Sequence, residues 1–233
     1  MNSHALIESA VKGVRHFIFS STAAVYGNPE RVPVREDDAT EPTSPYGSSK
    51  LMTEIMLRDA GSAHGLHHVI LRYFNVAGAD PLGRTGQSSK RATHLVKVSV
   101  ETALGLRPKV DVFGTNYPTP DGTCIRDYIH VGDLVRAHCD ALAYLRGGGV
   151  SATLNCGYGR GFSVLEVIET VKRVSGVDFK ITFAGRRAGD PAQIVAASDR
   201  VRSLLKWQPH FDDLQTIVSH ALAWERKLLT RAD

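Results

Sequence analysis

The amino-acid sequence predicts an α/β fold: a parallel sheet covered by helices, accompanied by a smaller α/β lobe. Three observations lead to this prediction. Helical and extended hydrophobic patterns alternate along the chain, which is typical of parallel sheets with helical crossovers. The chain has 233 residues, more than the usual single domain, and 42% of them are hydrophobic, so a core and a second lobe can both be buried. Capping and turn signals separate the successive patterns.

The first half of the chain predicts two helices, two strands and a long loop. Apolar residues at helical spacing over residues 6–14 precede a buried strand over residues 16–20. A Ser-Pro pair, which is a capping residue followed by proline at the first helical position, begins a helix over residues 46–60. A second buried strand covers residues 68–72. Residues 77–91 are rich in turn formers and lack periodicity, so they predict a loop of the kind that binds ligands.

The second half of the chain continues the alternation. Ser163, with Glu166 three residues later, forms the capping-box signature of a helix start. The three glycines 147–149 are expected to end the helix predicted over residues 133–145. The predicted elements are a helix over residues 93–104, a strand over 110–113, a helix over 133–145, a strand over 152–156, a helix over 163–174, a strand over 179–183 and helices over 198–205 and 214–228.

Charge and cysteine content exclude several classes of protein. With 28 Lys and Arg against 24 Asp and Glu the net charge is +4, but the basic residues are scattered, so no nucleic-acid partner is expected. The 3 cysteines show no Cys-x-x-Cys spacing, which predicts neither disulfides nor a zinc site and fits a reducing compartment. No apolar stretch reaches the length of a membrane span and the first residues lack a signal-peptide pattern, so we expect a cytoplasmic protein without a membrane partner.

Tyr46 and Lys50 lie one turn apart near the start of the helix predicted over residues 46–60. A phenol, with an ordinary pKa of about 10, is a poor base at neutral pH, and a neighbouring ammonium group favours the phenolate. By itself the pair is a weak signal, because a Tyr and a Lys at this spacing arise by chance in roughly one chain of this length in three. The pair therefore needs a second feature before it indicates chemistry.

A cluster of hydroxyl side chains supplies that second feature. Ser20, Ser21 and Thr22 come at the carboxyl end of the first buried strand, and ligands of open α/β sheets bind at that edge. In isolation such hydroxyls are more often turn or cap residues that satisfy backbone groups. Strand-end hydroxyls followed by a Tyr-x-x-x-Lys helix form a much more specific combination, which indicates proton transfer at a bound ligand.

This combination resembles the extended short-chain dehydrogenase/reductase superfamily, and more narrowly its UDP-glucose 4-epimerase family. The resemblance implies a Rossmann-like parallel sheet and the cofactor NAD, held beside Ser20, Tyr46 and Lys50. It gives Tyr46 the role of the catalytic base and Lys50 that of holding the cofactor ribose. Thr22 inherits the role of hydrogen-bonding the reacting hydroxyl of the sugar.

Three further stretches extend the resemblance over nearly the whole chain: residues 71–78, 112–131 and 186–190. In the family the first contributes an asparagine and the second an arginine to the nucleotide diphosphate, so Asn75 and Arg126 inherit that contact. The third contributes an arginine to the diphosphate and an aspartate to the ribose, which gives these roles to Arg187 and Asp190. Planar guanidinium groups suit a diphosphate and a carboxylate suits a ribose diol, although either arginine alone would more often be an ordinary surface residue.

The family pattern divides the chain between two parts. Residues 1–75 correspond to the carboxyl-terminal part of the NAD-binding domain, and residues 124–157 are expected to return to it. Residues 76–123 and 158–233 correspond to the nucleotide-sugar-binding lobe. The Gly-x-x-Gly-x-x-Gly turn at the start of the family pattern does not occur in this sequence, which begins roughly one hundred residues into that pattern. We therefore expect the missing amino-terminal strands and most of the NAD site to lie outside this chain.

The resemblance implies an isomerase that interconverts UDP-glucose and UDP-galactose by oxidation and re-reduction at C4 of the hexose. One alternative is a catalytically inactive fragment that binds a nucleotide sugar. Another is a sugar 4,6-dehydratase, which would need an acid beside Thr22, where Ala23 and Ala24 stand. Gln193 lies near the position whose side-chain size governs the acceptance of N-acetylated sugars in the family.

The partners expected from the resemblance are a UDP-hexose substrate and a second copy of the chain. Family members commonly form homodimers through the Tyr-x-x-x-Lys helix, whose apolar face here carries Leu51, Met52 and Ile55. No metal is expected, because the histidines at 64, 67 and 68 have no carboxylate partners at ligand spacing.

Overall fold

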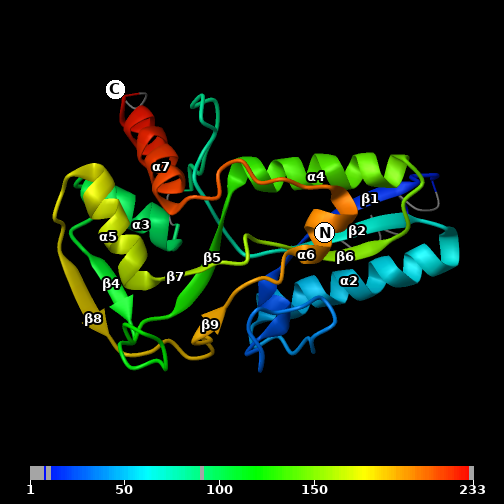
Figure 1. Ribbon diagram of the computed structural model, residues 1–233, viewed down its shortest axis with the longest axis horizontal. Coiled ribbons are helices and arrows are strands. Elements are labelled where there is room, and N and C mark those ends of the chain that lie inside the picture. Colours follow the sequence, from blue (N-terminus) through cyan, green and yellow to red (C-terminus); the bar gives the residue numbers. More distant parts are fainter. Residues whose placement is uncertain (1–7, 9–11, 90–91, 231–233) are drawn as a thin grey trace.

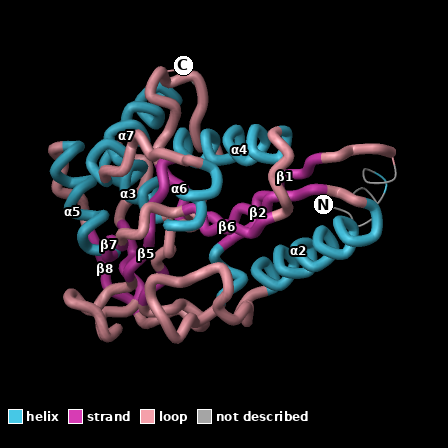
Figure 2. The backbone as a smooth tube through the Cα atoms, turned by 45° about the vertical axis from the view of Figure 1, so that its right-hand side comes forward, coloured by secondary structure: helices cyan, strands magenta, loops and turns pink. Residues whose placement is uncertain are grey.

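The computed structural model describes residues 8, 12–89 and 92–230, and in this part of the chain helices are separated by single strands or by pairs of strands up to the two closing helices (Figure 1). The helix predicted over residues 6–14 falls mostly outside the described residues. The described elements form a parallel sheet with helices on both sides and a lobe of shorter strands and helices (Figures 1 and 2). The predicted fold class is therefore confirmed.

The parallel sheet has three strands in the order β1 (His16–Thr22), β2 (His67–Tyr73) and β6 (Ala152–Cys156). Helices α2 (Pro45–His64) and α4 (Val131–Arg146) both contact β1 and β2, and they lie on opposite sides of the sheet (Figures 1 and 2). Strands covered on both faces are rich in aliphatic residues. The three central aliphatic residues of β2 accordingly have no exposed surface.

The lobe contains a four-stranded sheet and a two-stranded sheet. In the first, β5 (Ile125–His130) pairs with three short strands, β3 (Asn75–Ala77), β7 (Gly161–Ser163) and β9 (Gln193–Ile194). In the second, β4 (Val110–Phe113) pairs in parallel with β8 (Ile181–Ala184).

The helices of the lobe complete one core with the parallel sheet. Three of them pack against one another, namely α3 (Leu95–Ala103), α5 (Val164–Ser175) and α7 (Leu214–Leu229). The short helix α6 (Asp199–Leu205) contacts α4 and β6 instead. Apolar residues of β2 and β6 and of these helices belong to a single hydrophobic cluster, which fixes the lobe against the sheet.

Local capping signals explain where α2 and α4 begin and end. The Ser44 hydroxyl accepts a hydrogen bond from the Gly47 amide (3.1 Å) at the start of α2. The helix ends at Gly65, whose φ of 67° lies in the left-handed region that favours glycine, so it runs beyond the end predicted at residue 60. Helix α4 ends at Gly147, which confirms the helix stop predicted for the three glycines.

Some boundaries and the shortest strands differ from the sequence prediction. The strand predicted over residues 179–183 is β8, which begins only at Ile181, and Phe179 lies before it in the hydrophobic core. Strands β3, β5, β7 and β9 were not predicted. Three of them have three residues or fewer, and in the six residues of β5 charged and histidine side chains interrupt the hydrophobic pattern. The four-stranded sheet of the lobe is therefore a finding of the structure.

The division into residues 1–75 with 124–157 and residues 76–123 with 158–233 stays a prediction. Strands β1, β2 and β6, which it assigns to the NAD-binding part, form one sheet. Strand β5, which it assigns to the same part, pairs with the strands of the lobe.

His130 is a fully buried histidine at the junction of β5 and α4. Its Nδ1 accepts a hydrogen bond from the Gly132 amide (2.9 Å), so the proton of the neutral ring is on Nε2, which lies 3.0 Å from His220 Nδ1. Burial, together with the neighbouring His220, lowers the pKa of His130 to about 4. The native structure therefore holds this ring neutral.

We expect the free energy of unfolding to fall between pH 6.5 and pH 4. The folded-state pKa of His130 lies below its ordinary value of 6.5, so its contribution is present above pH 6.5 and is lost as the unfolded chain takes up a proton that the native ring excludes. A pKa difference of this size corresponds to about 3 kcal/mol. Urea unfolding at the two pH values measures the change. His130→Asn keeps a capping acceptor without a titrating group, and an equally large pH dependence in that variant would refute the assignment.

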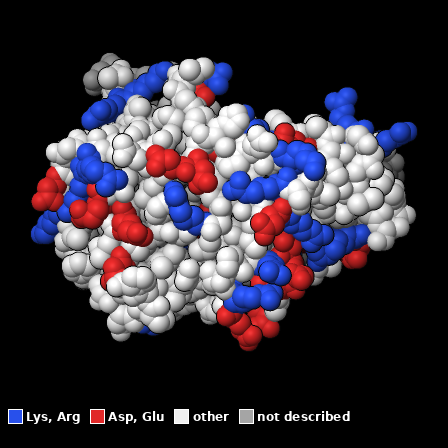
Figure 3. Space-filling view, viewed as in Figure 1, with Lys and Arg blue, Asp and Glu red and all other residues white. Residues whose placement is uncertain are grey.

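Charged side chains of both signs are interspersed over the face shown in Figure 3, so that face carries no continuous basic stripe. Among the residues that the structure describes, no helix combines the length and apolar character needed to cross a membrane.

Candidate active site

A cavity of about 780 Å³ lies at the carboxyl ends of β1 and β2, where the parallel sheet faces the lobe. Its walls come from the end of β1 with the short helix η1 (Ala23–Tyr26), from the start of α2, from the segment that follows β2, and from residues 187–194 of the lobe. Open α/β sheets bind their ligands at this edge, because polar groups at the strand ends and in the adjoining loops converge there.

Six of the eight site residues predicted from the sequence line this one cavity: Thr22, Tyr46, Asn75, Arg126, Arg187 and Asp190. Ser20 and Lys50 are not among its lining residues. The Ser20 hydroxyl lies 2.8 Å from His138 Nε2 on α4, and Lys50 Nζ donates to the Ser20 carbonyl oxygen (2.9 Å). Lys50 therefore bonds β1 at Ser20, two residues before Thr22. The individual roles of all eight residues stay predictions.

Tyr46 stands in the first turn of α2 with 52% of its surface exposed. Lys50 follows one turn later, with its Nζ 5.8 Å from the centroid of the Tyr46 ring and 5.1 Å from that of Phe19. Partial burial lowers the pKa of Lys50. A partly desolvated ammonium group exerts a stronger field on a neighbouring phenol than one in bulk water.

Thr22 ends β1 and is 8% exposed. Its Oγ1 accepts a hydrogen bond from the Ala24 amide (3.2 Å), which fixes the side chain at the start of η1. That bond uses an oxygen lone pair and leaves the hydroxyl proton for another acceptor. Thr22 can therefore donate to an oxygen of a ligand in the cavity while the backbone holds it in place.

The lobe side of the cavity carries two guanidinium groups and one carboxylate. Arg126 on β5 forms an ion pair with Asp190 (Nη2 to Oδ1, 3.1 Å) and donates to the Ile125 carbonyl oxygen (2.8 Å). The Arg187 guanidinium lies 3.7 Å from the centroid of the Phe113 ring. Arg126 and Asp190, for which the sequence predicts separate contacts to diphosphate and ribose, are thus paired with each other.

A second cavity of about 350 Å³ adjoins the first. The two share five lining residues, Asn75, His94, Arg126, Arg187 and Asp190. Beyond these shared residues the smaller cavity is lined in part by apolar and aromatic side chains, including Val110, Phe113 and Tyr128. The arrangement suits an elongated ligand whose middle is anionic and whose far end is a flat, partly apolar group.

Sequence reasoning missed several residues of the larger cavity. Tyr73, at the end of β2, lines it two residues before Asn75, and burial, reinforced by the nearby Tyr46, raises the pKa of Tyr73. Ile194 lines it too, whereas its neighbour Gln193, which the sequence pointed to, does not. The alternation of side chains along β9 explains this difference, because only one of two consecutive residues in a strand faces a given side.

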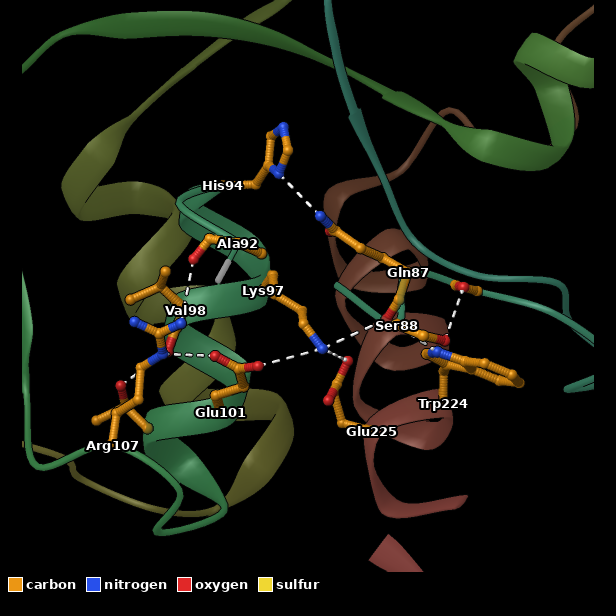
Figure 4. Close-up of polar contacts among 12 residues, drawn as sticks. Gln87, Ser88, Ala92, His94, Lys97, Val98, Glu101, Arg107, Trp224 and Glu225 are labelled. Carbon is orange, nitrogen blue, oxygen red and sulfur yellow. Dashed lines mark hydrogen bonds and ion pairs between the residues drawn. The ribbon is translucent and has the colours of Figure 1, made fainter. Parts of the chain in front are cut away.

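His94 was also missed, because it begins a helix without any motif around it. Figure 4 shows its ring at the start of α3, extending away from a buried charged cluster. His94 Nδ1 lies 2.9 Å from Gln87 Nε2, and the Gln87 carbonyl oxygen accepts hydrogen bonds from Lys97 (3.3 Å) and from the Trp224 indole (3.1 Å). Gln87 belongs to the loop that the sequence predicts over residues 77–91, and these bonds hold the loop beside the cavity at this residue.

No group of three or more His, Cys, Asp or Glu side chains is arranged to hold a metal ion in the described ranges 12–89 and 92–230 or at residue 8.

Comparison with known proteins identifies the relatives of this chain. Residues 2–157 match the model of a family described as "NAD dependent epimerase/dehydratase family". A UDP-glucose 4-epimerase of Azospirillum brasilense is 61% identical over 228 residues, which are 97% of this chain and 66% of that protein. The chain therefore spans about two thirds of the length of this relative.

Solved structures show the same similarity in three dimensions. The UDP-glucose 4-epimerase from Brucella ovis in complex with NAD is 40% identical with a TM-score of 0.91, and the match covers 95% of this chain and 68% of that one. The UDP-glucose 4-epimerase from Bifidobacterium longum in complex with NAD+ and UDP is 35% identical with a TM-score of 0.90, covering 97% of this chain and 68% of that one.

Proposed function

Since this chain belongs to the NAD dependent epimerase/dehydratase family, we propose that it interconverts UDP-glucose and UDP-galactose through transient oxidation at C4 of the hexose. The observation that carries the proposal is the convergence on one cavity of six residues, to each of which the family resemblance gives a part in binding or chemistry. The test incubates the intact protein, meaning the longest polypeptide that its gene encodes, with NAD and UDP-galactose and measures UDP-glucose. Absence of conversion by folded protein that binds UDP would contradict it.

The two adjoining cavities suggest how the substrate lies. The hexose occupies the larger cavity beside Thr22 and Tyr46, and the uridine occupies the smaller one against Phe113. The diphosphate lies between them, over Arg126 and Arg187, where guanidinium groups can donate to two phosphate oxygens at once. Binding at the nucleotide end leaves the hexose free to turn within the larger cavity, which epimerisation requires.

Tyr46 acts as the base in this proposal. The 4-hydroxyl group gives its proton to the Thr22 hydroxyl oxygen as the Thr22 hydroxyl proton moves to the Tyr46 phenolate, so Thr22 relays the proton and Tyr46 is the final acceptor. Lys50, whose Nζ lies 5.8 Å from the Tyr46 ring centroid, places a positive charge beside the phenol. When the second face of the sugar is presented, Tyr46 returns the proton to O4, so no net proton transfer remains.

The donor set at the end of β1 fits a bound NAD. Lys50 uses one of its three N–H groups on the Ser20 carbonyl oxygen, which leaves donors for the hydroxyl oxygens of a ribose beside Tyr46. Ser20, Tyr46 and Lys50 are the residues of this chain that would hold the nicotinamide end. A bound NAD would supply a reversible hydride acceptor for C4 of the sugar, which would make the reaction an isomerisation without net redox change.

Two other functions fit the residues less well. A sugar 4,6-dehydratase needs an acid near the sugar for the elimination step, and the residues after Thr22 that line the cavity are Ala23 and Ala24. A catalytically inactive nucleotide-sugar-binding protein would have no use for a Tyr46 phenol and Lys50 ammonium held one turn apart at the cavity edge.

We expect Arg187→Met to weaken UDP binding by roughly 10- to 150-fold. One charge-assisted contact to the diphosphate is worth about 1.5 to 3 kcal/mol. Arg186→Met is the matched control, because Arg186 bonds Asn116 and lies over the Tyr117 ring instead of lining the cavity. Titration calorimetry of both variants with UDP measures the difference. Equal affinities in the two variants would remove Arg187 from the binding site.

We also propose that the protein forms a homodimer through α2. Met52 is 63% exposed and Ile55 is 46% exposed, which leaves apolar surface on the outer side of this helix. Met52→Lys with Ile55→Lys should shift the sedimentation of the intact protein toward that of a monomer. A wild-type protein that sediments as a monomer at micromolar concentration would contradict the proposal.

A further inference from the structure

Glu54 is a charged residue with no exposed surface, two turns after Tyr46 on α2. Its carboxylate accepts hydrogen bonds from Arg72 on β2 (Nη2 to Oε2, 2.7 Å; Nε to Oε1, 3.0 Å) and from the Ser21 hydroxyl on β1 (2.5 Å). Arg72 is itself 3% exposed. This side chain therefore ties α2 to both strands whose carboxyl ends form the cavity.

One side of α2 bonds two consecutive residues at the end of β1 and lines the cavity together with the third. Lys50 donates to the Ser20 carbonyl oxygen, Glu54 accepts from the Ser21 hydroxyl, and Tyr46 lines the cavity together with Thr22. The spacing of four residues between Tyr46, Lys50 and Glu54 gives the three a shared side of the helix. The two bonded contacts set where α2 lies along β1, and so they set where Tyr46 lies relative to Thr22.

Arg72 extends the same contacts to η1, the segment that follows Thr22. Its Nη1 donates to the Tyr26 hydroxyl (2.9 Å) and to the Glu36 carbonyl oxygen (3.2 Å). The Tyr26 hydroxyl donates in turn to Asn155 Oδ1 on β6 (2.7 Å). Both sides of the cavity edge, the helix with Tyr46 and the segment after Thr22, are thus fixed on one buried guanidinium.

We propose, on the basis of the proposed function, that Glu54 is a positioning residue. Through Ser21 and Arg72 it holds the Tyr46 phenol at the distance from the Thr22 hydroxyl that proton transfer requires. A buried ion pair contributes little net folding stability, because desolvation offsets most of the Coulomb attraction and a well-packed apolar pair often stabilises the fold equally. It does fix the relative orientation of the elements that carry it, because a planar guanidinium and a carboxylate meet in a fixed geometry. Misplacement of a catalytic group by about 1 Å can cost about 100-fold in rate.

The test uses two variants of the intact protein and a matched control. Glu54→Gln removes the charge, and Ser21→Ala removes only the bond to β1 and leaves the ion pair in place, so it serves if Glu54→Gln does not fold. Glu225→Gln is the control, because Glu225 also forms a buried ion pair, with Lys97 (2.5 Å), but joins α3 to α7 (Figure 4). The readouts are kcat and KM for UDP-galactose and the affinity for UDP.

We expect kcat to fall by roughly 100-fold in Glu54→Gln and by roughly tenfold in Ser21→Ala, with UDP affinity unchanged within about threefold in both. Ser21→Thr, which keeps a hydroxyl donor, should recover most of the rate. Glu225→Gln should lose thermal stability and keep its kcat. A kcat within threefold of wild type in both folded variants, or an equal fall in the control, would overturn the proposal.

A crystal structure of Ser21→Ala or Glu54→Gln separates this proposal from the proposed function. It reports the separation of Tyr46 Oη and Thr22 Oγ1 whether or not the protein turns over UDP-galactose. An inactive wild-type protein would refute the proposed function only. An unchanged separation in the variants would refute the positioning role, even in an active enzyme.

Discussion

We expect Tyr46→Phe to lower kcat for the proposed interconversion of UDP-galactose and UDP-glucose by about two to four orders of magnitude, because it removes the proposed general base and little else. The side chain is 52% exposed, so the loss of its hydroxyl opens no cavity and leaves no buried group without a partner. Affinity for UDP should stay within about threefold of wild type, since the diphosphate contacts come from the lobe. Steady-state kinetics and calorimetry on the intact protein measure both quantities.

Tyr144→Phe is the control for this experiment. Tyr144 lies on α4 and is not among the residues that line the cavity. Its replacement should leave kcat unchanged within about twofold. If Tyr46→Phe retained more than a tenth of the wild-type kcat, Tyr46 would not be the base, and the proton transfer would have to be assigned to another group of the cavity.

Replacing Lys97 by methionine lowers the free energy of unfolding by about 3 to 5 kcal/mol, the cost of removing one partner of a buried ion pair. Lys97 is 7% exposed and contacts Glu225 (2.5 Å) and Glu101 (3.2 Å), as Figure 4 shows. Arg107 still neutralises Glu101 in the variant, but Glu225, which is 4% exposed, keeps no cation that the structure describes. Chemical denaturation measures the change.

The pH dependence of this loss gives a second check. Burial raises the pKa of Glu225 even with Lys97 present. Without Lys97 the pKa rises further, and a carboxyl whose folded pKa is raised contributes stability at low pH that is lost as the pH rises through that pKa. The deficit of Lys97→Met should therefore shrink between pH 7 and pH 5. Lys109→Met breaks an ion pair with Asp111 whose side chains are 42% exposed, and it should cost less than about 1 kcal/mol. An equal cost for both variants would contradict the account.

The parallel sheet and its helices could be predicted because their signals are local. Aliphatic runs such as the centre of β2, the Ser44 cap of α2 and the glycines after α4 each depend on a few neighbouring residues. The four-stranded sheet of the lobe depends on pairs distant in sequence, such as Arg126 with Ile194, and no local pattern announces them.

The candidate site likewise has residues that could be predicted from local signals and residues that could not. Thr22, Tyr46 and Asn75 follow strands or begin a helix, so their convergence follows from the rule that parallel strands end at one edge. The ion pair of Arg126 with Asp190 and the contact of His94 with Gln87 arise only in the folded lobe. The pair of Glu54 with Arg72 could not be predicted, because a buried ion pair has no sequence signature beyond a charged residue within an apolar pattern.

The most direct test of the central claim follows the hydrogen at C4. The intact protein is incubated with NAD and UDP-galactose carrying deuterium at C4 of the hexose, and the product is analysed by mass spectrometry and NMR. If the hydride is removed from C4 and returned to its other face, the product is UDP-glucose with the deuterium still at C4. Absence of UDP-glucose, loss of the deuterium to solvent, or its transfer to C6 as expected of a 4,6-dehydratase would contradict the account.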